Sequence, residues 1–289
     1  MPGHPVPGRT AIRALAARHG IRPSRALGQN FLVDPNLARA IASDAGVGPG
    51  DTVVEIGPGL GSLTVALAAT GADVVAVEFD RALLPALEET VGGMSSVRLV
   101  RADAMRVRWT DVVPEGRTTM VSNLPYNVAV PVLLRMLEEA PSVDPFVVMV
   151  QREVGERLAA GVGDAAYGAV SVKVAYFAEA RAFRRVPADV FWPAPKVESI
   201  VVRLARRAAP PVPVELRGPL FAVIDAGFAE RRKRMTNALR RLGAEPAPAA
   251  ELMRTAGLPE TARAEQIDLG GFGRLTQGAV DAGLVGAVG

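Results

Sequence analysis

The chain has 289 residues, of which 49% are hydrophobic and 22% charged, a composition typical of a globular protein with a substantial core. It has no cysteine and two histidines, which excludes disulfides, thiolate metal sites and cysteine nucleophiles and makes a histidine metal site improbable. No segment reaches the roughly 18 apolar residues of a membrane span, and the N-terminus lacks a signal-peptide apolar block, so a cytoplasmic location is expected.

Charge is distributed unevenly along the chain. The net charge is +5 over residues 1–30, −8 over 31–180, +8 over 181–240 and −2 over 241–289. Basic segments on either side of an acidic middle favour a polyanionic partner that is held by the flanks. The alternative is that these arginines only form solvated surfaces.

The first expected element is a short basic helix within RTAIRALAARHG, residues 9–20, which Gly20 would end. We assign residues 1–26 to a basic N-terminal arm. Its candidates for contact with a polyanion are Arg9, Arg13, Arg18, Arg22 and Arg25.

From Asp51 onward, short apolar strands alternate with helices. The strands are predicted at 52–56, 73–77, 97–101, 118–121 and 146–150, and helices between them at 62–69, 81–90 and 132–140. This alternation predicts an α/β fold with a parallel, doubly wound sheet. Two more β-rich runs, 170–177 and 197–204, are expected to add antiparallel strands at the sheet edge.

The prolines of RRAAPPVPVE, residues 206–215, predict a linker, because proline is excluded from helix interiors and central strands. No convincing strand follows, so residues 216–289 are expected to form a small α-helical domain. Residues 27–205 would then form the main domain.

The segment VVEIGPGLGSLTVAL, residues 53–67, predicts a strand, a glycine turn and a helix. Gly57, Gly59 and Gly61 allow a tight turn that comes close to a ligand, next to the free N–H groups of a helix N-terminus. The spacing lacks the third glycine of the dinucleotide fingerprint, which disfavours NAD without excluding it.

Acidic residues follow the next two strands. Glu78 ends one strand, where a carboxylate can accept both ribose hydroxyls, and Asp103 follows the other. A nucleoside pocket lined by carboxylates suits a ligand with a positive charge and no phosphate. S-adenosylmethionine, which has an adenosine and a sulfonium, is the cofactor that the pattern favours.

The fourth strand leads into Asn-Leu-Pro-Tyr, residues 123–126. The exocyclic amine of adenine has two N–H donors, so a pocket that methylates it needs two acceptors. The side-chain oxygen of Asn123 and the carbonyl of Leu124 can supply them, Pro125 removes a backbone donor, and Tyr126 offers a ring on which the base can stack. The alternative is a structural turn with a core tyrosine.

Six segments in this order resemble the ribosomal RNA adenine N6,N6-dimethyltransferases: LGQNFLVD at 27–34, VEIGPGLGSLT at 54–64, VEFD at 77–80, ADAM at 102–105, SNLPYNVAVPVL at 122–133 and FWPAPKVESIVV at 191–202. The resemblance implies a class I, Rossmann-like S-adenosylmethionine methyltransferase sheet with a small all-α C-terminal domain. Gly28, Lys196 and the run RRKRMTNAL at 231–239 resemble the housekeeping branch, which dimethylates two adjacent adenines near the 3′ end of small-subunit (16S) rRNA.

The resemblance also implies roles for single residues. The ribose would be held by Glu78 and the cofactor adenine amine by Asp103, while Phe191 would stack on the target adenine opposite Tyr126. The implied catalytic residues are Asn123, Leu124, Pro125, Tyr126 and Phe191. The implied cofactor-binding residues are Asn30, Leu32, Gly57, Gly59, Glu78, Asp103 and Asn123, and the implied RNA-binding residues are Lys196, Arg231, Arg232, Lys233 and Arg234.

We therefore expect a monomeric, metal-independent rRNA adenine dimethyltransferase that acts on the pre-30S particle and takes part in small-subunit biogenesis. Three alternatives stay open: a large-subunit rRNA methylase that gives macrolide resistance, an RNA-binding assembly factor without turnover, and a DNA adenine methylase. Leu124 fits the last of these less well.

Overall fold

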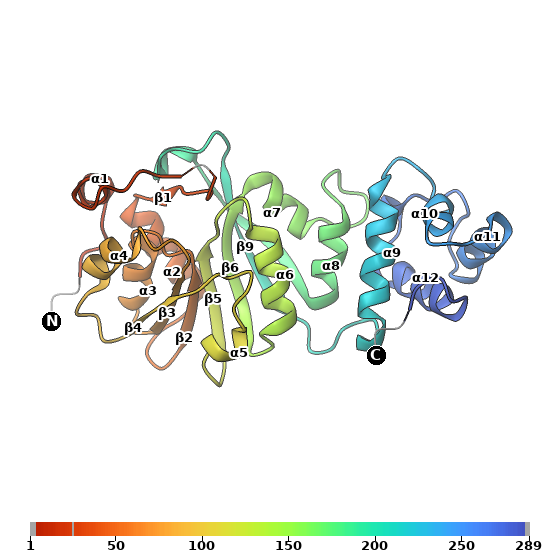
Figure 1. Ribbon diagram of the computed structural model, residues 1–289, viewed down its shortest axis with the longest axis horizontal. Helices are drawn as coiled ribbons and strands as arrows, with labels where there is room; N and C mark the ends of the chain where they lie inside the picture. The colour runs from red at the N-terminus through yellow and green to blue at the C-terminus, as the bar shows by residue number, and fades with distance from the viewer. Residues whose placement is uncertain (1–3, 25, 287–289) are drawn as a thin grey trace. The chain divides into compact units, whose positions relative to one another are not determined.

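The computed structural model describes residues 4–24 and 26–286, which group into two compact units (Figure 1). The first unit runs to Gly155 and also includes Arg181–Ala205. The second comprises Glu156–Ala180 and the chain from Arg206 onward.

The first unit is built on a seven-stranded sheet with the order β4-β3-β2-β5-β6-β9-β7. Strands β2 to β6 pair in parallel, and β9 pairs antiparallel with β6. The predicted parallel sheet and the antiparallel strand at 197–204 are thus confirmed. The strands are β2 Thr52–Ile56, β3 Asp73–Glu78, β4 Val97–Arg101, β5 Thr118–Asn123, β6 Val143–Gln151, β7 Ala178–Val186 and β9 Ser199–Arg206.

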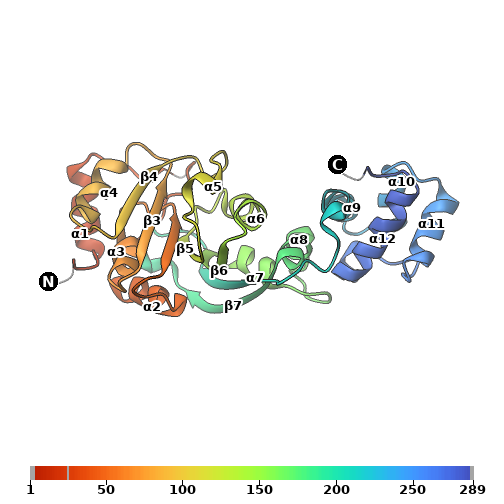
Figure 2. The ribbon, with the colours of Figure 1, turned by 90° about the horizontal axis from the view of Figure 1, so that it is seen from below.

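Helices lie on both faces of this sheet (Figure 2), which explains why its central strands are continuous apolar runs. Helices α2 and α3 pack on the face that includes Val53, Val121 and Val147. The other face is covered in part by α6, which buries Val132, Leu133 and Met136. The helices are α2 Pro35–Ala45, α3 Ser62–Ala68, α4 Leu84–Val91, α5 Trp109–Val112 and α6 Ala129–Glu139, and the first half of α7 Arg152–Ala159 also belongs to this unit.

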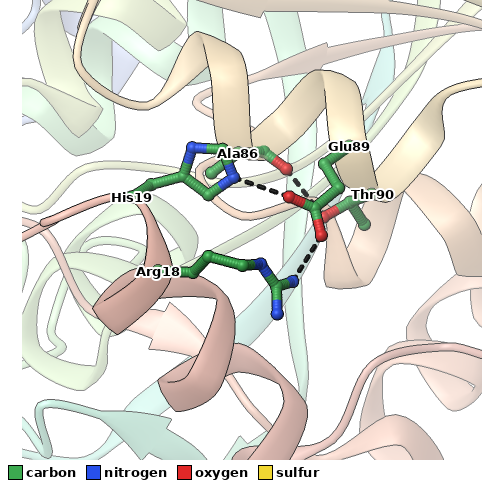
Figure 3. A network of polar contacts seen from close by, with 5 residues as sticks. All are labelled: Arg18, His19, Ala86, Glu89 and Thr90. Carbon is green, nitrogen blue, oxygen red and sulfur yellow. Dashed lines mark hydrogen bonds and ion pairs between the residues drawn. The ribbon is translucent and has the colours of Figure 1, made fainter.

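The predicted basic helix of the arm is α1, Arg9–Arg18, and several of its arginines have partners within the first unit. Arg18 and His19 both bind the carboxylate of Glu89 on α4, with His19 Nε2 at 2.7 Å (Figure 3). The side chain of Arg9 donates to the carbonyl of Asp189, and Arg13 lies 6.0 Å from the ring of Trp192. Arg25 lies outside the described residues. The arm is therefore secured to the first unit by charges that the sequence also offers as contacts for a polyanion.

Helix α1 also contributes to a small apolar cluster. Ile12, Leu15 and Ala16 are buried there beside Phe31 and Leu60. Phe31 belongs to a second, two-stranded sheet in which β1, Phe31–Leu32, pairs antiparallel with β8, Phe191–Trp192. A short 3₁₀ turn, η1 Ala188–Val190, precedes β8.

The second unit is mainly helical. It contains α8 Ala169–Phe177, η2 Val214–Leu216, α9 Arg217–Ala229, α10 Met235–Arg241, α11 Pro246–Thr255, η3 Ala264–Gln266 and α12 Leu269–Asp281. The prediction of a strand at 170–177 is wrong, because this valine-rich run is α8. Tyr176 of α8 packs edge-on against Phe221 of α9, so burial among helices outweighs the strand preference of its β-branched residues.

The second unit resumes at Arg206, the first residue of the segment 206–215 that is predicted as a linker. Val212 and Leu216 are buried in the core of the second unit, so the proline-rich segment is part of that unit. Residues 156–180 also group with it. The basic run at 231–234 lies between two helices, because α9 ends at Ala229 and α10 begins at Met235.

Gly155 of α7 allows this helix to approach the sheet closely. A Cβ atom added there would lie 2.1 Å from Cγ2 of Ile200 and 3.0 Å from Cγ2 of Val202. We expect Gly155→Ala to lower the free energy of unfolding by about 1–3 kcal/mol through overpacking, measured by urea denaturation. Gly270→Ala in α12 is the matched control, because a Cβ there meets nothing closer than 3.6 Å. Equal effects of the two substitutions would contradict this packing.

Candidate functional site

Three predicted site residues lie at the carboxyl end of the parallel strands. Glu78 is the last residue of β3, Asn123 is the last of β5, and Asp103 follows β4 by two residues. Strands β3, β2 and β5 are neighbours in the sheet, so these side chains meet at the edge where such folds bind ligands.

A cavity of about 290 Å³ opens at this edge. All the predicted cofactor-binding residues and the whole 123–126 tetrad line it: Asn30, Leu32, Gly57, Gly59, Glu78, Asp103, Asn123, Leu124, Pro125 and Tyr126. The segments that the sequence places far apart thus meet around one space in the first unit.

The glycine turn is packed directly against two other segments of the site. A Cβ on Gly57 would lie 3.2 Å from the ring of Pro125, and one on Gly59 would lie 2.9 Å from Phe31. Both glycines also have positive φ, which other residues rarely adopt. Glycine is therefore required here by close packing as well as by the turn, and the turn, the tetrad and β1 form one wall.

The amide of Asn123 is fixed at one end and free at the other. Its Nδ2 donates to the carbonyl of Asn30 at 3.2 Å. Its Oδ1 is buried and has no hydrogen-bond partner among the described residues. A buried acceptor without a donor costs about 1–3 kcal/mol, so this atom is suited to receive an N–H donor from a ligand in the cavity.

Tyr126 is held by a hydrogen bond at its far end. Its hydroxyl lies 2.6 Å from Oγ of the buried Ser199, which is the first residue of β9. Burial raises the pKa of the Tyr126 hydroxyl, so the side chain is neutral at physiological pH. With the hydroxyl anchored, the ring lines the cavity wall in a fixed orientation.

The Glu78 carboxylate is oriented by backbone donors on both oxygens. Oε2 accepts from the N–H of Gly59 at 3.1 Å and Oε1 accepts from the N–H of Asp80 at 2.8 Å. Burial raises its pKa, and these N–H groups act in the opposite direction. Each oxygen accepts one bond and can accept another, so a pair of neighbouring hydroxyls could bind there.

Glu55 is a site residue to which the sequence assigned no role. It is almost fully buried in β2, it lines the cavity, and its Oε2 has no hydrogen-bond partner among the described residues. Burial raises its pKa from 4.5 to about 8, and the charge of Glu78 adds to the shift. Its position on a strand end beside the glycine turn is the signal that could have identified it.

Three further residues of the cavity carry no sequence prediction. Phe79 and Met105 line it although 58% and 38% of their surfaces are exposed, which is unusual for large apolar side chains. Gln29 closes the rim by donating from Nε2 to Asp80 Oδ2 at 2.7 Å. Phe79 and Met105 follow the strand-end acids Glu78 and Asp103 closely in the sequence, which is the pattern that could have indicated them.

Phe191 lies elsewhere than the predicted stacking role requires. Its side chain is fully buried in the core beneath β1, where Phe191 pairs with Leu32, and it is absent from the lining of the cavity. Neither face of the ring is accessible to a base. In this structure the residue supports the β1 wall instead.

The basic residues predicted to bind RNA fall into two groups. Lys196 is exposed in the first unit, on the loop between β8 and β9. Arg232, Lys233 and Arg234 are exposed in the second unit, where they line an open depression together with Asn237, Thr261 and Arg263. Arg231 is directed differently: it binds Glu265 at 2.7 Å and the carbonyl of Ala165 at 3.0 Å.

The described residues contain no group of three or more His, Asp or Glu side chains that could hold a metal ion. Within the same ranges, no helix is long and apolar enough to cross a membrane.

A mostly parallel seven-stranded sheet, a glycine turn and strand-end carboxylates around a cavity define a class I, Rossmann-like methyltransferase domain. Solved structures share this fold. The 23S rRNA methyltransferase ErmE matches with a TM-score of 0.65 and 24% identity over 86% of this chain and 99% of that one. A dimethyladenosine transferase from Plasmodium falciparum matches with a TM-score of 0.71 and 21% identity over 88% and 98%.

Sequence comparison then identifies the family. A family model described as ribosomal RNA adenine dimethylase matches residues 21–275, so the chain belongs to that family. Proteins named ribosomal RNA small subunit methyltransferase A are similar over nearly the whole chain. The one from Nocardia farcinica is 47% identical over 93% of this chain and 94% of its own length, and the one from Rhodococcus opacus is 48% identical over 93% of each.

The raised pKa of Glu55 predicts a dependence of stability on pH. The unfolded chain has an ordinary carboxyl, so between its pKa of 4.5 and the folded value of about 8 the folded state binds the extra proton. The free energy of unfolding is therefore expected to fall as pH rises through this range, by at most about 1.4 kcal/mol per pH unit. Glu55→Gln, which cannot ionise, should flatten the decline in urea unfolding from pH 6 to 9. The same dependence of the free energy of unfolding on pH in both proteins would contradict the raised pKa of Glu55.

Proposed function

We propose that the chain uses S-adenosylmethionine to dimethylate the N6 amine of two adjacent adenines near the 3′ end of small-subunit rRNA. The observation that carries this proposal is at Asn123, a residue of the cavity lining, whose buried Oδ1 has no partner in the described part of the chain. It supplies an acceptor for an N–H donor in a pocket that also presents a ring and a carboxylate-lined cofactor space.

The tetrad would prepare the amine for methylation by position and polarity. Asn123 Oδ1 and the carbonyl of Leu124 would accept the two N–H donors, which favours a tetrahedral nitrogen with its lone pair directed at the methyl group. Tyr126 would hold the base by stacking. When bound, S-adenosylmethionine supplies a methyl group activated by its sulfonium. The amine loses one proton to solvent with each methyl group it gains, so the chain needs no general base.

The residues present fit S-adenosylmethionine. Glu78 would bind the ribose through its two oriented oxygens, and Asp103 would bind the adenine amine. The glycine turn with Asn30 and Leu32 would border the methionine part, and the exposed apolar surfaces of Phe79 and Met105 would cover the adenine ring. Glu55 would face a positive charge, which favours its ionised form and lowers its raised pKa.

Assignment to the small subunit rests on the names of the similar proteins from Nocardia farcinica, Rhodococcus opacus and Thermobifida fusca, which all refer to that subunit. The large-subunit methylase is supported only by the fold of ErmE. We propose that the chain acts as a monomer on the pre-30S particle, and that Lys196, Arg232, Lys233 and Arg234 contact its RNA. The ion pair of Arg231 with Glu265 makes it the least available of the predicted contacts.

Incubation with labelled S-adenosylmethionine tests the proposal. The substrates are undermethylated small subunits, naked small-subunit RNA and large-subunit RNA, followed by nucleoside mass spectrometry. Dimethyladenosine on small subunits alone is the expected result. Label on large-subunit RNA would reassign the substrate, and cofactor binding with no label on any substrate would favour a non-catalytic assembly factor.

Removing the acceptor of Asn123 should affect turnover more than cofactor binding. We expect Asn123→Ala to reduce kcat by about 10²- to 10³-fold, the cost of losing one oriented polar contact to the reacting group. The affinity for S-adenosylhomocysteine, measured by calorimetry, should fall by less than about tenfold, since Asn123 borders the cofactor at one edge. Unchanged kcat would contradict the role given to Oδ1.

The exposed basic residues of the second unit should set the salt dependence of RNA binding. Arg232→Ala and Lys233→Ala are each expected to reduce the slope of log affinity against log salt by up to about one unit. Arg254→Ala is the matched control, because this exposed arginine of the same unit is ion-paired with Glu251 and Glu260. A slope that changes equally in all three variants would contradict a specific contact surface.

A further inference from the structure

The turn at residues 103–107, called here the Asp103 turn, presents Asp103 to the cavity. One side chain of α6 binds this turn from outside. Arg135 donates from Nη1 to the carbonyl of Ala104 at 3.1 Å and from Nη2 to the carbonyl of Val107 at 2.6 Å. Its third bond, from Nε, goes to Glu139 at 2.7 Å, one turn later on the same helix. All three sides of the guanidinium are therefore used.

The turn is also organised from within. Asp103 Oδ1 accepts from the N–H of Met105 at 2.8 Å, and the Asp103 carbonyl accepts from the N–H groups of Arg106 and Val107 at 2.9 and 2.8 Å. These bonds do not use the carbonyls of Ala104 and Val107, and each of these carbonyls accepts a hydrogen bond from Arg135. Asp103 Oδ2 also lies 3.6 Å from Nε of the exposed Arg106. The turn that begins at Asp103 thus depends on local contacts and on one distant side chain.

The geometry needs arginine in particular. Two carbonyls three residues apart are reached by two nitrogens of one planar group, which a lysine ammonium cannot reproduce from a single position. The side chain of Arg135 is only 19% exposed, so lost bonds are poorly replaced by water, and Glu139 offsets its charge. The Arg135 side chain and the Asp103 turn are therefore held to each other by two hydrogen bonds.

Helix α6 links this turn to the tetrad. It begins at Ala129, three residues after Tyr126, and Val132 on the turn before Arg135 lines the cavity. One helix thus follows the residues proposed to bind the target base. From its middle, it also bonds the turn that begins at the residue proposed to bind the cofactor adenine.

We infer that Arg135 is a positioning residue that sets the discrimination of the cofactor site for a purine bearing an exocyclic amine. This inference rests on the proposed function, in which Asp103 accepts a hydrogen bond from that amine. Arg135 itself would touch neither cofactor nor RNA, and it acts by fixing the position of the Asp103 carboxylate.

The test compares S-adenosylhomocysteine with S-inosylhomocysteine, which has an oxygen in place of the amine, by calorimetry on the full chain. The unaltered protein is expected to prefer the adenine compound by about tenfold, the value of one well-placed hydrogen bond. Arg135→Lys should lose about tenfold in affinity for the adenine compound and less than twofold for the inosine compound. The KM for S-adenosylmethionine should rise with kcat nearly unchanged.

Arg98→Lys is the matched control. Arg98, a residue of β4, makes the same type of bond, from Nη2 to the carbonyl of Val112 at 2.8 Å. Val112 follows β4 in the chain and lies outside the Asp103 turn. We expect it to leave the preference between the two compounds unchanged. Glu139→Gln is a milder variant that keeps both carbonyl contacts of Arg135, and it should reduce the preference by about threefold or less.

The possible outcomes separate this inference from the proposed function. Equal loss of affinity for both compounds in Arg135→Lys, or an unchanged preference in a folded variant, would overturn the inference while leaving the proposed function standing. Failure of the unaltered protein to bind S-adenosylhomocysteine would overturn both. Should Arg135→Lys fail to fold, an unchanged preference in Asp103→Ala would overturn the inference, because that variant removes the carboxylate that Arg135 positions.

Discussion

The hydrogen bond from Asn123 Nδ2 to the carbonyl of Asn30 is the contact on which the proposed chemistry depends. An asparagine amide can rotate by half a turn and exchange its donor for its acceptor, but this bond allows only one orientation. Asn123 lines the cavity, and its Oδ1 is thereby held buried and without a partner in the ranges that the structure describes. The folded chain bears that cost of about 1–3 kcal/mol, which a ligand with an N–H donor would remove.

The other contacts of the site keep that orientation in place. Asn30 belongs to the segment that continues into β1, and β1 is held by its pairing with β8 and by Phe31 against the glycine turn. The turn in turn packs on Pro125 of the tetrad. Three short segments separated widely in the sequence therefore support one amide. The arm contributes indirectly, because α1 packs beside Phe31 and is joined to α4 through Glu89.

Electrostatics of the cavity favour a cationic ligand. Glu55 and Glu78 are both buried near the glycine turn, and burial raises both pKa values. Two carboxyl groups removed from water and close to each other resist full ionisation, and a positive charge between them would relieve this. A ligand with a sulfonium and an ammonium meets that requirement better than one with a pyrophosphate. Acidic residues at strand ends are therefore an informative signal for this type of ligand in the amino-acid sequence itself.

Periodic and local signals in the sequence are sufficient to predict the parallel sheet, the cavity and the tetrad. The strands predicted at 73–77 and 118–121 lie within β3 and β5, which extend to Glu78 and Asn123. The features that the sequence does not indicate depend on packing between distant segments. The valine-rich run 170–177 is helical because it is buried among helices, and Phe191 is enclosed by a strand pair that no local pattern indicates. The partner of Arg231 is 34 residues away, so its role could not be separated from that of its neighbours by sequence alone.

A crystal structure of the chain with S-adenosylhomocysteine and adenosine, as a stand-in for the target nucleotide, would test the central claim most directly. The proposed chemistry predicts the adenosine N6 about 2.7–3.2 Å from both Asn123 Oδ1 and the Leu124 carbonyl, with the base against the ring of Tyr126. An adenosine bound elsewhere, or an Asn123 amide rotated so that Oδ1 no longer faces the base, would contradict it.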